Sequence, residues 1–203
     1  VDGSLRYGAA AGDYFLRLEA EAGVCSENLS GYDVQIDSTA PADILISEGF
    51  DTFPPAGWVI EDGAAGSDAT WGQCNGCGDT LTGSSGPFAF IDSDAAGAGS
   101  TTDSSLVAAS MNLSTYTDAQ LTFRHYYNKG FSASELAEVD YTIDGGSTWT
   151  TLISYNADTA DGAVVILDLA TVVGESNVTI RFHYVAGWDF YWRIDDITVL
   201  GFD

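Results

Sequence analysis

Apolar and polar residues alternate with a period of two along several stretches of this chain, and this pattern limits the fold more than any other feature. The side chains of Leu121, Phe123, His125 and Tyr127 fall on one face of an extended strand, and residues 178–185 repeat the pattern. Such alternation is typical of antiparallel strands with one buried face. Because no stretch keeps the 3.6-residue apolar period of a helix, the sequence predicts an all-β antiparallel β-sandwich.

A hairpin and one short helical turn are the other local predictions. The strand predicted at residues 137–143 ends in an Asp-Gly turn at Asp144, and a second strand is expected to return from Trp149. Residues 167–173 have room for one or two helical turns. The alternation in the first strand places Val139, Tyr141 and Ile143 inside, and Glu138, Asp140 and Thr142 outside.

The charge of the chain excludes one class of partner and disfavours another. Its 203 residues include 30 Asp and Glu but only 6 Lys and Arg, which gives a net charge of −24. A nucleic-acid binder needs cationic side chains to displace the counterions of the phosphate backbone, and an anionic membrane repels an acidic chain. No apolar run approaches the ~20 residues of a membrane-spanning helix, so no membrane insertion is expected. The acidic, lysine-poor composition favours a secreted or cell-surface protein in a saline or calcium-rich setting.

Residues 38–43 are predicted to link two unequal parts. Residues 1–37 contain three short alternating runs, which indicate about three strands, and residues 44–203 continue as one β-rich domain. Three strands bury too little apolar surface to be stable alone. We therefore expect residues 1–37 to dock on the larger domain or on another molecule.

Cys25, Cys74 and Cys77 are the candidates for a disulfide. The two-residue spacing of Cys74 and Cys77 fits a redox pair, half of a metal site or a small disulfide loop. A thioredoxin-like pair needs a βαβ context and a four-cysteine zinc site needs two more ligands, and the chain provides neither. The prediction is a disulfide between Cys74 and Cys77, or between one of them and Cys25.

A series of short motifs follows a fixed order from Ser47 almost to the end of the chain. They are residues 48–58 (EGFDTFPPAGW), 70–71 (TW), 89–94 (AFIDSD), 105–107 (SLV), 111–114 (MNLS), 121–127 (LTFRHYY), 143–149 (IDGGSTW), 177–182 (NVTIRF) and 192–199 (WRIDDITV). In order and spacing they resemble the cleaved-adhesin or choice-of-anchor family of bacterial extracellular domains, which are relatives of the MAM fold. The resemblance implies a secreted or surface-attached jelly roll without catalytic activity. The insertion around Cys74 and Cys77 lies outside the family's pattern.

Two further motifs lie in the first segment. Residues 12–18 (GDYFLRL) and 31–36 (GYDVQI) resemble the last strands of a bacterial pre-peptidase C-terminal domain, although the early strands of such a domain are missing. Proteins with both modules tend to be secreted or surface-attached, often as accessory parts of proteases and adhesins.

Acidic residues recur in pairs at three places that a jelly roll can bring together. Clustered carboxylates repel each other and are costly to bury, and a calcium ion with about six to eight oxygen ligands offsets that cost. The resemblance points the same way, because adhesin and MAM-like jelly rolls commonly hold structural calcium between the first strand, a middle loop and the last strand. The alternative is that these carboxylates are solvated or bonded to loop amides. The predicted ligands are Glu48, Asp51, Asp92, Asp94, Asp195 and Asp196, with Glu48, Asp92 and Asp196 foremost.

Aromatic residues cluster just before the last predicted strand. Trp and Tyr rings stack on sugar rings and on apolar partner surfaces, so Trp188 and Tyr191 are the predicted ligand or interface residues. Trp192 is expected to be internal. The remaining tryptophans lie within the motifs of the resemblance and are expected in the core: Trp58, Trp71 and Trp149.

Catalysis is not expected. The chain has no Gly-x-Ser-x-Gly elbow, and the separation of two carboxyl groups that glycoside hydrolysis requires cannot be established from a sequence. His125 falls on the apolar face of its strand and is expected to be a hydrogen-bonded core histidine. His183 falls on the polar face of its strand and is expected beside a carboxylate.

The expected function is adhesion or assembly outside the cell. Residues 1–37 look like an incomplete sandwich, and exposed strand edges pair with other chains, which yields a filament when the contact does not close. The expected partners are further copies of this chain, cell-surface or extracellular proteins, or glycans. The alternative is an accessory, carbohydrate-binding domain of a secreted protease or other hydrolase.

Overall fold

The chain forms a β-sandwich in the computed structural model, which describes residues 42–131 and 134–203. In this part eleven strands build two stacked sheets, and the helical structure is limited to two short 3-10 turns. Every strand pair whose register is known is antiparallel. The predicted all-β antiparallel sandwich is therefore confirmed.

The two sheets are named after their central strands. The β11 sheet contains β1 (Ala42–Glu48), β3 (Gly72–Cys74), β4 (Phe88–Asp92), β6 (Asp118–Asn128), β9 (Ala163–Asp168) and β11 (Tyr191–Phe202). The β10 sheet contains β2 (Val59–Asp62), β5 (Thr102–Val107), β7 (Leu136–Thr142), β8 (Thr150–Tyr155) and β10 (Thr179–Ala186). The 3-10 turns are η1 (Asp94–Ala96) and η2 (Ala170–Val172).

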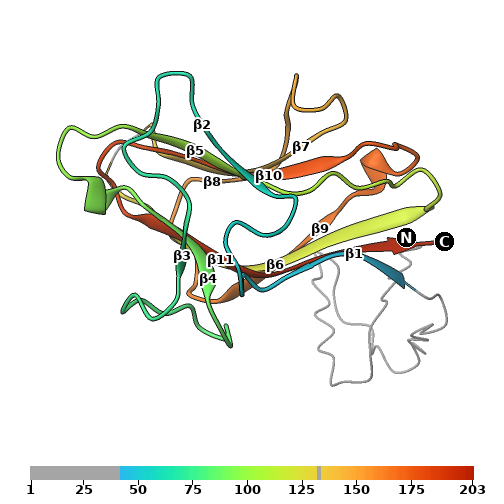
Figure 1. The fold of residues 1–203 in the computed structure, drawn as a ribbon, viewed down its shortest axis with the longest axis horizontal. Helices are drawn as coiled ribbons and strands as arrows, with labels where there is room; N and C mark the ends of the chain where they lie inside the picture. Colours follow the sequence, from blue (N-terminus) through green and yellow to red (C-terminus); the bar gives the residue numbers. More distant parts are fainter. Residues whose placement is uncertain (1–41, 132–133) are drawn as a thin grey trace, which may run out of the picture. The chain divides into compact units, whose positions relative to one another are not determined.

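The chain crosses repeatedly between the sheets, as in a jelly roll. The strand order is β3-β4-β11-β6-β9 in one sheet, where β1 also pairs with β11, and β2-β5-β10-β7-β8 in the other. From β4 to β11 the strands change sheet at every step except the β7–β8 hairpin, and Figure 1 shows the resulting two layers. Each central strand therefore lies between partners that are distant in the sequence.

The alternating residues of β6 and β10 form the centre of the core. Leu121, Phe123, His125 and Tyr127 are all buried, and so are the inward residues of β10. The rings of Phe123 and Phe182 meet edge to face with centroids 5.3 Å apart, which joins the two sheets. The faces predicted for these two strands are confirmed.

The strand β7 departs from the predicted alternation at two points. Asp140 and Thr142 point outward as expected but are buried, while Ile143 lies beyond the strand and is 45% exposed. The pairing of β7 with β8 shifts between Val139 and Asp140, which is a β-bulge. The expectation that Ile143 lies inside is therefore wrong, because the strand ends at Thr142.

The predicted hairpin and helical turn are both present. Gly145 and Gly146 adopt φ values of 71° and 89°, the left-handed region that glycine enters without strain, and β8 returns from Thr150. The Asp144 carboxylate accepts hydrogen bonds from the amide and the hydroxyl of Thr148. The turn η2 falls within residues 167–173.

Among the described residues the first strand begins inside the segment predicted as a linker, since β1 starts at Ala42. The strands predicted in residues 1–37, the pre-peptidase-like motifs and Cys25 all lie outside the described residues. Within residues 42–131 and 134–203, no helix is long and apolar enough to span a membrane.

Candidate functional site

An open pocket of about 390 Å³ lies at one end of the sandwich, where the loop after β6 meets the loop between β10 and β11. Phe131 is 93% exposed and Trp188 is 50% exposed, and the Phe131 ring lies 5.8 Å from that of Phe190. We call this the aromatic pocket. Its lining residues are Asp94, Phe131, Gly187, Trp188, Asp189 and Phe190.

One buried carboxylate holds the two loops of the aromatic pocket together. Oδ1 of Asp189 accepts a 2.9 Å hydrogen bond from the amide of Phe131, and Oδ2 accepts one of 3.1 Å from the amide of Gly187. The amide of Asp189 donates to Oγ of Ser93 at 3.0 Å. A Cβ atom on Gly130 would overlap with the side chain of Asp189, so only glycine fits where the loops touch.

A second buried carboxylate supports the same loops from below. Glu135 accepts a hydrogen bond from the amide of Gly130, and its Oε1 accepts one of 3.3 Å from the hydroxyl of Tyr184. Burial raises the pKa of Glu135, and the ammonium group of Lys129 lies 4.0 Å away. Hydrogen bonds to the two buried carboxylates therefore support the residues that line the pocket.

The lining of the pocket is suited to a ligand with both apolar and hydroxyl groups. Phe131 and Trp188 offer ring faces, and the exposed carboxylate of Asp94 offers hydrogen-bond acceptors. Trp188 has a φ of 53°, a conformation that is rare for a bulky residue and that is found where the surrounding structure imposes it. These lining residues include no serine, threonine, cysteine or histidine.

Sequence reasoning found part of the aromatic pocket. Trp188 was predicted as a ligand residue and lies in it, whereas Phe131, Asp189 and Phe190 were missed. Asp189 and Phe190 belong to the aromatic segment 187–192, which was a usable signal. Phe131 follows Gly130 after β6, and no local pattern connects that position with Trp188.

Tyr191 lies outside the pocket, on the outer face of the β11 sheet. Its ring centroid is 4.0 Å from the Arg193 guanidinium and 5.7 Å from the ring of Tyr126. Arg193 in turn donates to the carbonyl of Thr80 at 2.6 Å and pairs with Asp79. Tyr191 therefore packs beneath the loop that follows β3, where it is half-buried.

That loop carries the disulfide, which joins Cys74 to Cys77 in the structure. This is one of the pairings that the sequence left open. Cys74, Leu81 and Phe88 form a small apolar cluster on the outer face of the β11 sheet, separate from the main core. The insertion thus has its own packing against the sheet.

Three of the four tryptophans predicted to be internal are buried. Trp192 is fully buried, and Trp58 and Trp71 lie in the main core. Trp149 lies outside the main core and is only partly buried. Its ring centroid is 4.3 Å from the Arg181 guanidinium on the outer face of the β10 sheet. The prediction of a core position for Trp149 is wrong.

The acidic pairs predicted to bind calcium are not gathered at one place. In the register of β4 and β11, Asp92 lies opposite Tyr191. Tyr191 precedes Asp195 by four residues, which separates their Cα atoms by ~13 Å along the strand. Oδ1 of Asp92 accepts hydrogen bonds from the amides of Asp94 and Ala95, although burial raises its pKa. Asp94 lies on the rim of the aromatic pocket. One ion cannot bind these two residues together with Asp195.

The other four predicted ligands differ in their surroundings. Asp196 forms an ion pair of 2.8 Å with Arg124, Glu48 accepts a hydrogen bond from the amide of Phe50, and Asp51 is exposed. Asp195 is buried, and its Oδ1 has no hydrogen-bond partner among the described residues. Burial raises the pKa of Asp195. A Cβ on Gly49 would lie 4.0 Å from the free oxygen, so the end of β1 passes close to it.

No protein-family model and no curated protein matches the chain. Among solved structures, it is similar to the K1 cleaved adhesin domain of Lys-gingipain from Porphyromonas gingivalis, with 22% identity, a TM-score of 0.57, and coverage of 76% of this chain and 96% of that one. The K3 cleaved adhesin domain of the same protein gives 18% identity, a TM-score of 0.60, and coverage of 79% and 99%. TmCBM61 in complex with β-1,4-galactotriose gives 12% identity, a TM-score of 0.51, and coverage of 76% and 94%. At these identities the similarity establishes a common fold.

Proposed function

We propose that this chain is a non-catalytic, extracellular binding module that adheres to neutral glycans through the aromatic pocket. The observation that carries the proposal is the pair of exposed rings, Phe131 and Trp188, in a pocket whose two loops are tied by the buried Asp189. A rigid site binds with a smaller loss of conformational entropy than a flexible one. Exposed aromatic rings on a rigid frame are therefore suited to recognition.

A sugar matches the chemistry of the pocket. The apolar face of a sugar ring stacks on aromatic rings, and its hydroxyl groups donate to a carboxylate such as that of Asp94. The pocket volume of about 390 Å³ lies near the lower end of the usual range for small-molecule sites, about 300–1,000 Å³. A short saccharide segment fits this size. The net charge of −24 disfavours anionic sugars, which leaves neutral ones.

Two further findings support the proposal. The fold is shared with cleaved adhesin domains and with TmCBM61, whose structure contains β-1,4-galactotriose. The disulfide between Cys74 and Cys77 belongs to an oxidising compartment, as expected for a secreted protein.

Isothermal titration of the full chain with neutral oligosaccharides tests this function, with β-1,4-galactotriose as the first probe. The variants Trp188→Ala and Phe131→Ala should each weaken binding at least about tenfold, because stacked rings dominate such sites. Ile44→Ala is the matched control, since it also removes an exposed apolar side chain and should leave the affinity unchanged. Binding that survives both pocket substitutions, or the absence of binding to every neutral glycan tried, contradicts the proposal.

A second candidate function is self-assembly through sheet edges. β9 is an edge strand in the described part of the β11 sheet, and its Val164 and Ile166 are 54% and 45% exposed. Such an edge pairs readily with a strand from another chain. Electron microscopy of native material would show regular fibres if this candidate is correct and dispersed particles if it is not, whereas the glycan titration does not depend on the outcome.

We propose in addition that a structural calcium ion binds at Asp195. Its buried, unpartnered Oδ1 is the feature that fits a cation, and the residue after Glu48, Gly49, approaches this oxygen. Asp92 and Asp94 do not fit, because the register places them elsewhere. A bound ion would neutralise the buried charge and stabilise the junction of β1 with β11.

A further inference from the structure

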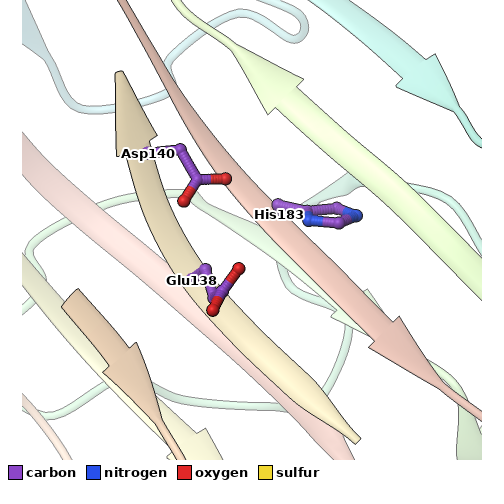
Figure 2. Close-up of side chains that lie close together, drawn as sticks. All are labelled: Glu138, Asp140 and His183. Carbon is purple, nitrogen blue, oxygen red and sulfur yellow. The ribbon is translucent and has the colours of Figure 1, made fainter. Parts of the chain in front are cut away.

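Three ionisable side chains meet on the outer face of the β10 sheet, away from the aromatic pocket. Glu138 and Asp140 come from β7, two positions apart, and His183 comes from β10. The register pairs Glu138 with His183 and Asp140 with Arg181 across the two strands. Figure 2 shows the two carboxylates on the same side of the imidazole ring.

The ligand-type atoms of these three residues all lie within 4.8 Å of one another. Asp140 is 1% exposed, and its Oδ1 has no hydrogen-bond partner in the described chain. The same is true of Nδ1 of His183, which is buried as well. Two buried atoms of neighbouring residues are thus left unsatisfied beside a further carboxylate, which is a costly arrangement unless something binds between them.

The hydrogen bond made by the other ring nitrogen of His183, Nε2, accounts for the unpaired Nδ1. Nε2 lies 2.9 Å from Oδ1 of Asp103, so the neutral ring places its proton on Nε2 and donates it to that carboxylate. Nδ1 then carries no proton, and its free lone pair lies on the side of Glu138 and Asp140. Metal-binding histidines are commonly oriented in this way, with the second ring nitrogen bonded to a carboxylate.

The local charge also favours a divalent ion. Asp103, Glu138 and Asp140 bring three negative charges, and Arg181 brings one positive charge through its 2.8 Å ion pair with Oδ2 of Asp140. The ring of Trp149 covers the Arg181 guanidinium at 4.3 Å, which keeps that cation on Oδ2 and leaves Oδ1 open. The net charge of these four side chains is therefore minus two, which one divalent cation would neutralise.

We propose that Glu138, Asp140 and His183 form a binding site for one divalent transition-metal ion, with Zn²⁺ as the representative. One imidazole nitrogen and two carboxylate oxygens are a ligand set for zinc and its neighbours, whereas calcium takes oxygen ligands alone. Bonds of about 2.0–2.2 Å require the ligand atoms to close by about 1 Å, which small side-chain rotations provide. Glu138 and His183 are half-buried, and a water molecule would be the fourth ligand.

The test uses the full chain, freed of metal by a chelator and titrated with Zn²⁺ near neutral pH. The wild type should bind one more equivalent than His183→Gln, which removes the nitrogen ligand. Asp103→Asn should lower the affinity for this Zn²⁺ ion by about 10–100-fold, the usual effect of losing a residue that orients a metal ligand. Glu138→Gln should lower the affinity at least as much. Glu175→Gln changes an exposed carboxylate outside the cluster and should bind as the wild type does.

Several outcomes decide the proposal. Asp140→Asn also breaks the ion pair with Arg181, so its folding is checked by circular dichroism, and the half-buried Glu138 and His183 variants keep the test valid if it unfolds. Equal Zn²⁺ binding by wild type, His183→Gln and Glu138→Gln overturns the site. Displacement of Zn²⁺ by an equal concentration of Ca²⁺ overturns the metal class. A Co²⁺ visible spectrum that appears in the wild type and is lost in His183→Gln supports both.

Discussion

The indole N–H of Trp192 donates a 3.2 Å hydrogen bond to Nδ1 of His125, and both side chains are almost completely buried. The bond connects β11 with β6 inside the sandwich and confirms that His125 is a hydrogen-bonded core residue. Because Nδ1 accepts, the neutral ring has its proton on Nε2. Burial lowers the pKa of His125 from 6.5 to about 4.

This histidine should make the stability of the chain fall in mild acid. Between about pH 6.5 and pH 4 the unfolded state binds a proton at His125 and the folded state does not, so the free energy of unfolding decreases as the pH falls. The loss should reach up to about 3 kcal/mol. Urea unfolding at a series of pH values measures it in the wild type and in His125→Gln, which does not titrate.

The comparison with the variant is needed because other buried groups act in the opposite direction. Burial raises the pKa of Asp92, Glu135 and Asp195, so their contribution to stability is present below their ordinary pKa and is lost as the pH rises. The difference between wild type and His125→Gln isolates the histidine. A difference that does not change with pH would contradict the assignment.

Gly130→Ala should damage the aromatic pocket. The added Cβ would overlap with Asp189, so the loop after β6 has to move, at a cost of roughly 1–3 kcal/mol. Thermal unfolding measures the destabilisation, and titration with the glycan probe measures the loss of affinity. Gly86→Ala is the control, since its Cβ meets nothing within 4 Å. Equal behaviour of the two variants would show that the loops do not depend on this contact.

Arg193 and Asp79 should contribute unequally to stability although they form an ion pair. Arg193 is buried, stacks on Tyr191 and donates to the carbonyl of Thr80, so Arg193→Met should cost about 2 kcal/mol. The Asp79 side chain is 40% exposed, and Asp79→Asn should cost less than about 1 kcal/mol. Denaturant unfolding of both variants checks this, and equal costs would assign the stabilisation to the ion pair itself.

Removal of calcium should lower the melting temperature if Asp195 holds an ion. A ligand that binds only the folded state stabilises it according to its concentration, so the wild type should melt at a lower temperature in chelator than in excess calcium. Asp195→Asn should show no such difference. A wild-type melting temperature that is insensitive to calcium would contradict a calcium ion at Asp195.

The sequence was sufficient to predict the faces of the central strands. In β6 and β10 the apolar residues alternate without interruption, and a period of two determines which side chains are buried once the segment is extended. The same rule failed in β7, because the bulge beside Asp140 and the end of the strand at Thr142 depend on β8 and on the following turn. Trp149 was misplaced for a similar reason, since its partner Arg181 is contributed by a distant strand.

The candidate sites depend on contacts between segments that no local pattern connects. Trp188 stands in an aromatic segment and was predicted, but Phe131 joins it through the hydrogen bonds of Asp189 and the ring of Phe190. The separation of Asp92 from Asp195 follows from the register of β4 and β11, which the sequence does not specify. His183 was expected beside a carboxylate, and Asp103 fulfils that prediction, whereas the approach of Glu138 and Asp140 requires the pairing of β7 with β10.

The position of β11 has a consequence for the order in which the protein folds. This strand is the last along the described chain, yet it lies between β4 and β6, and its residue Tyr191 pairs with Asp92 about one hundred positions earlier. A chain emerging from the ribosome can form β3 with β4 and β6 with β9, but the two halves of the sheet stay apart until the final strand is made. Such distant pairing predicts slow folding, on the scale of milliseconds to seconds, and a nascent chain whose strand edges stay open during synthesis.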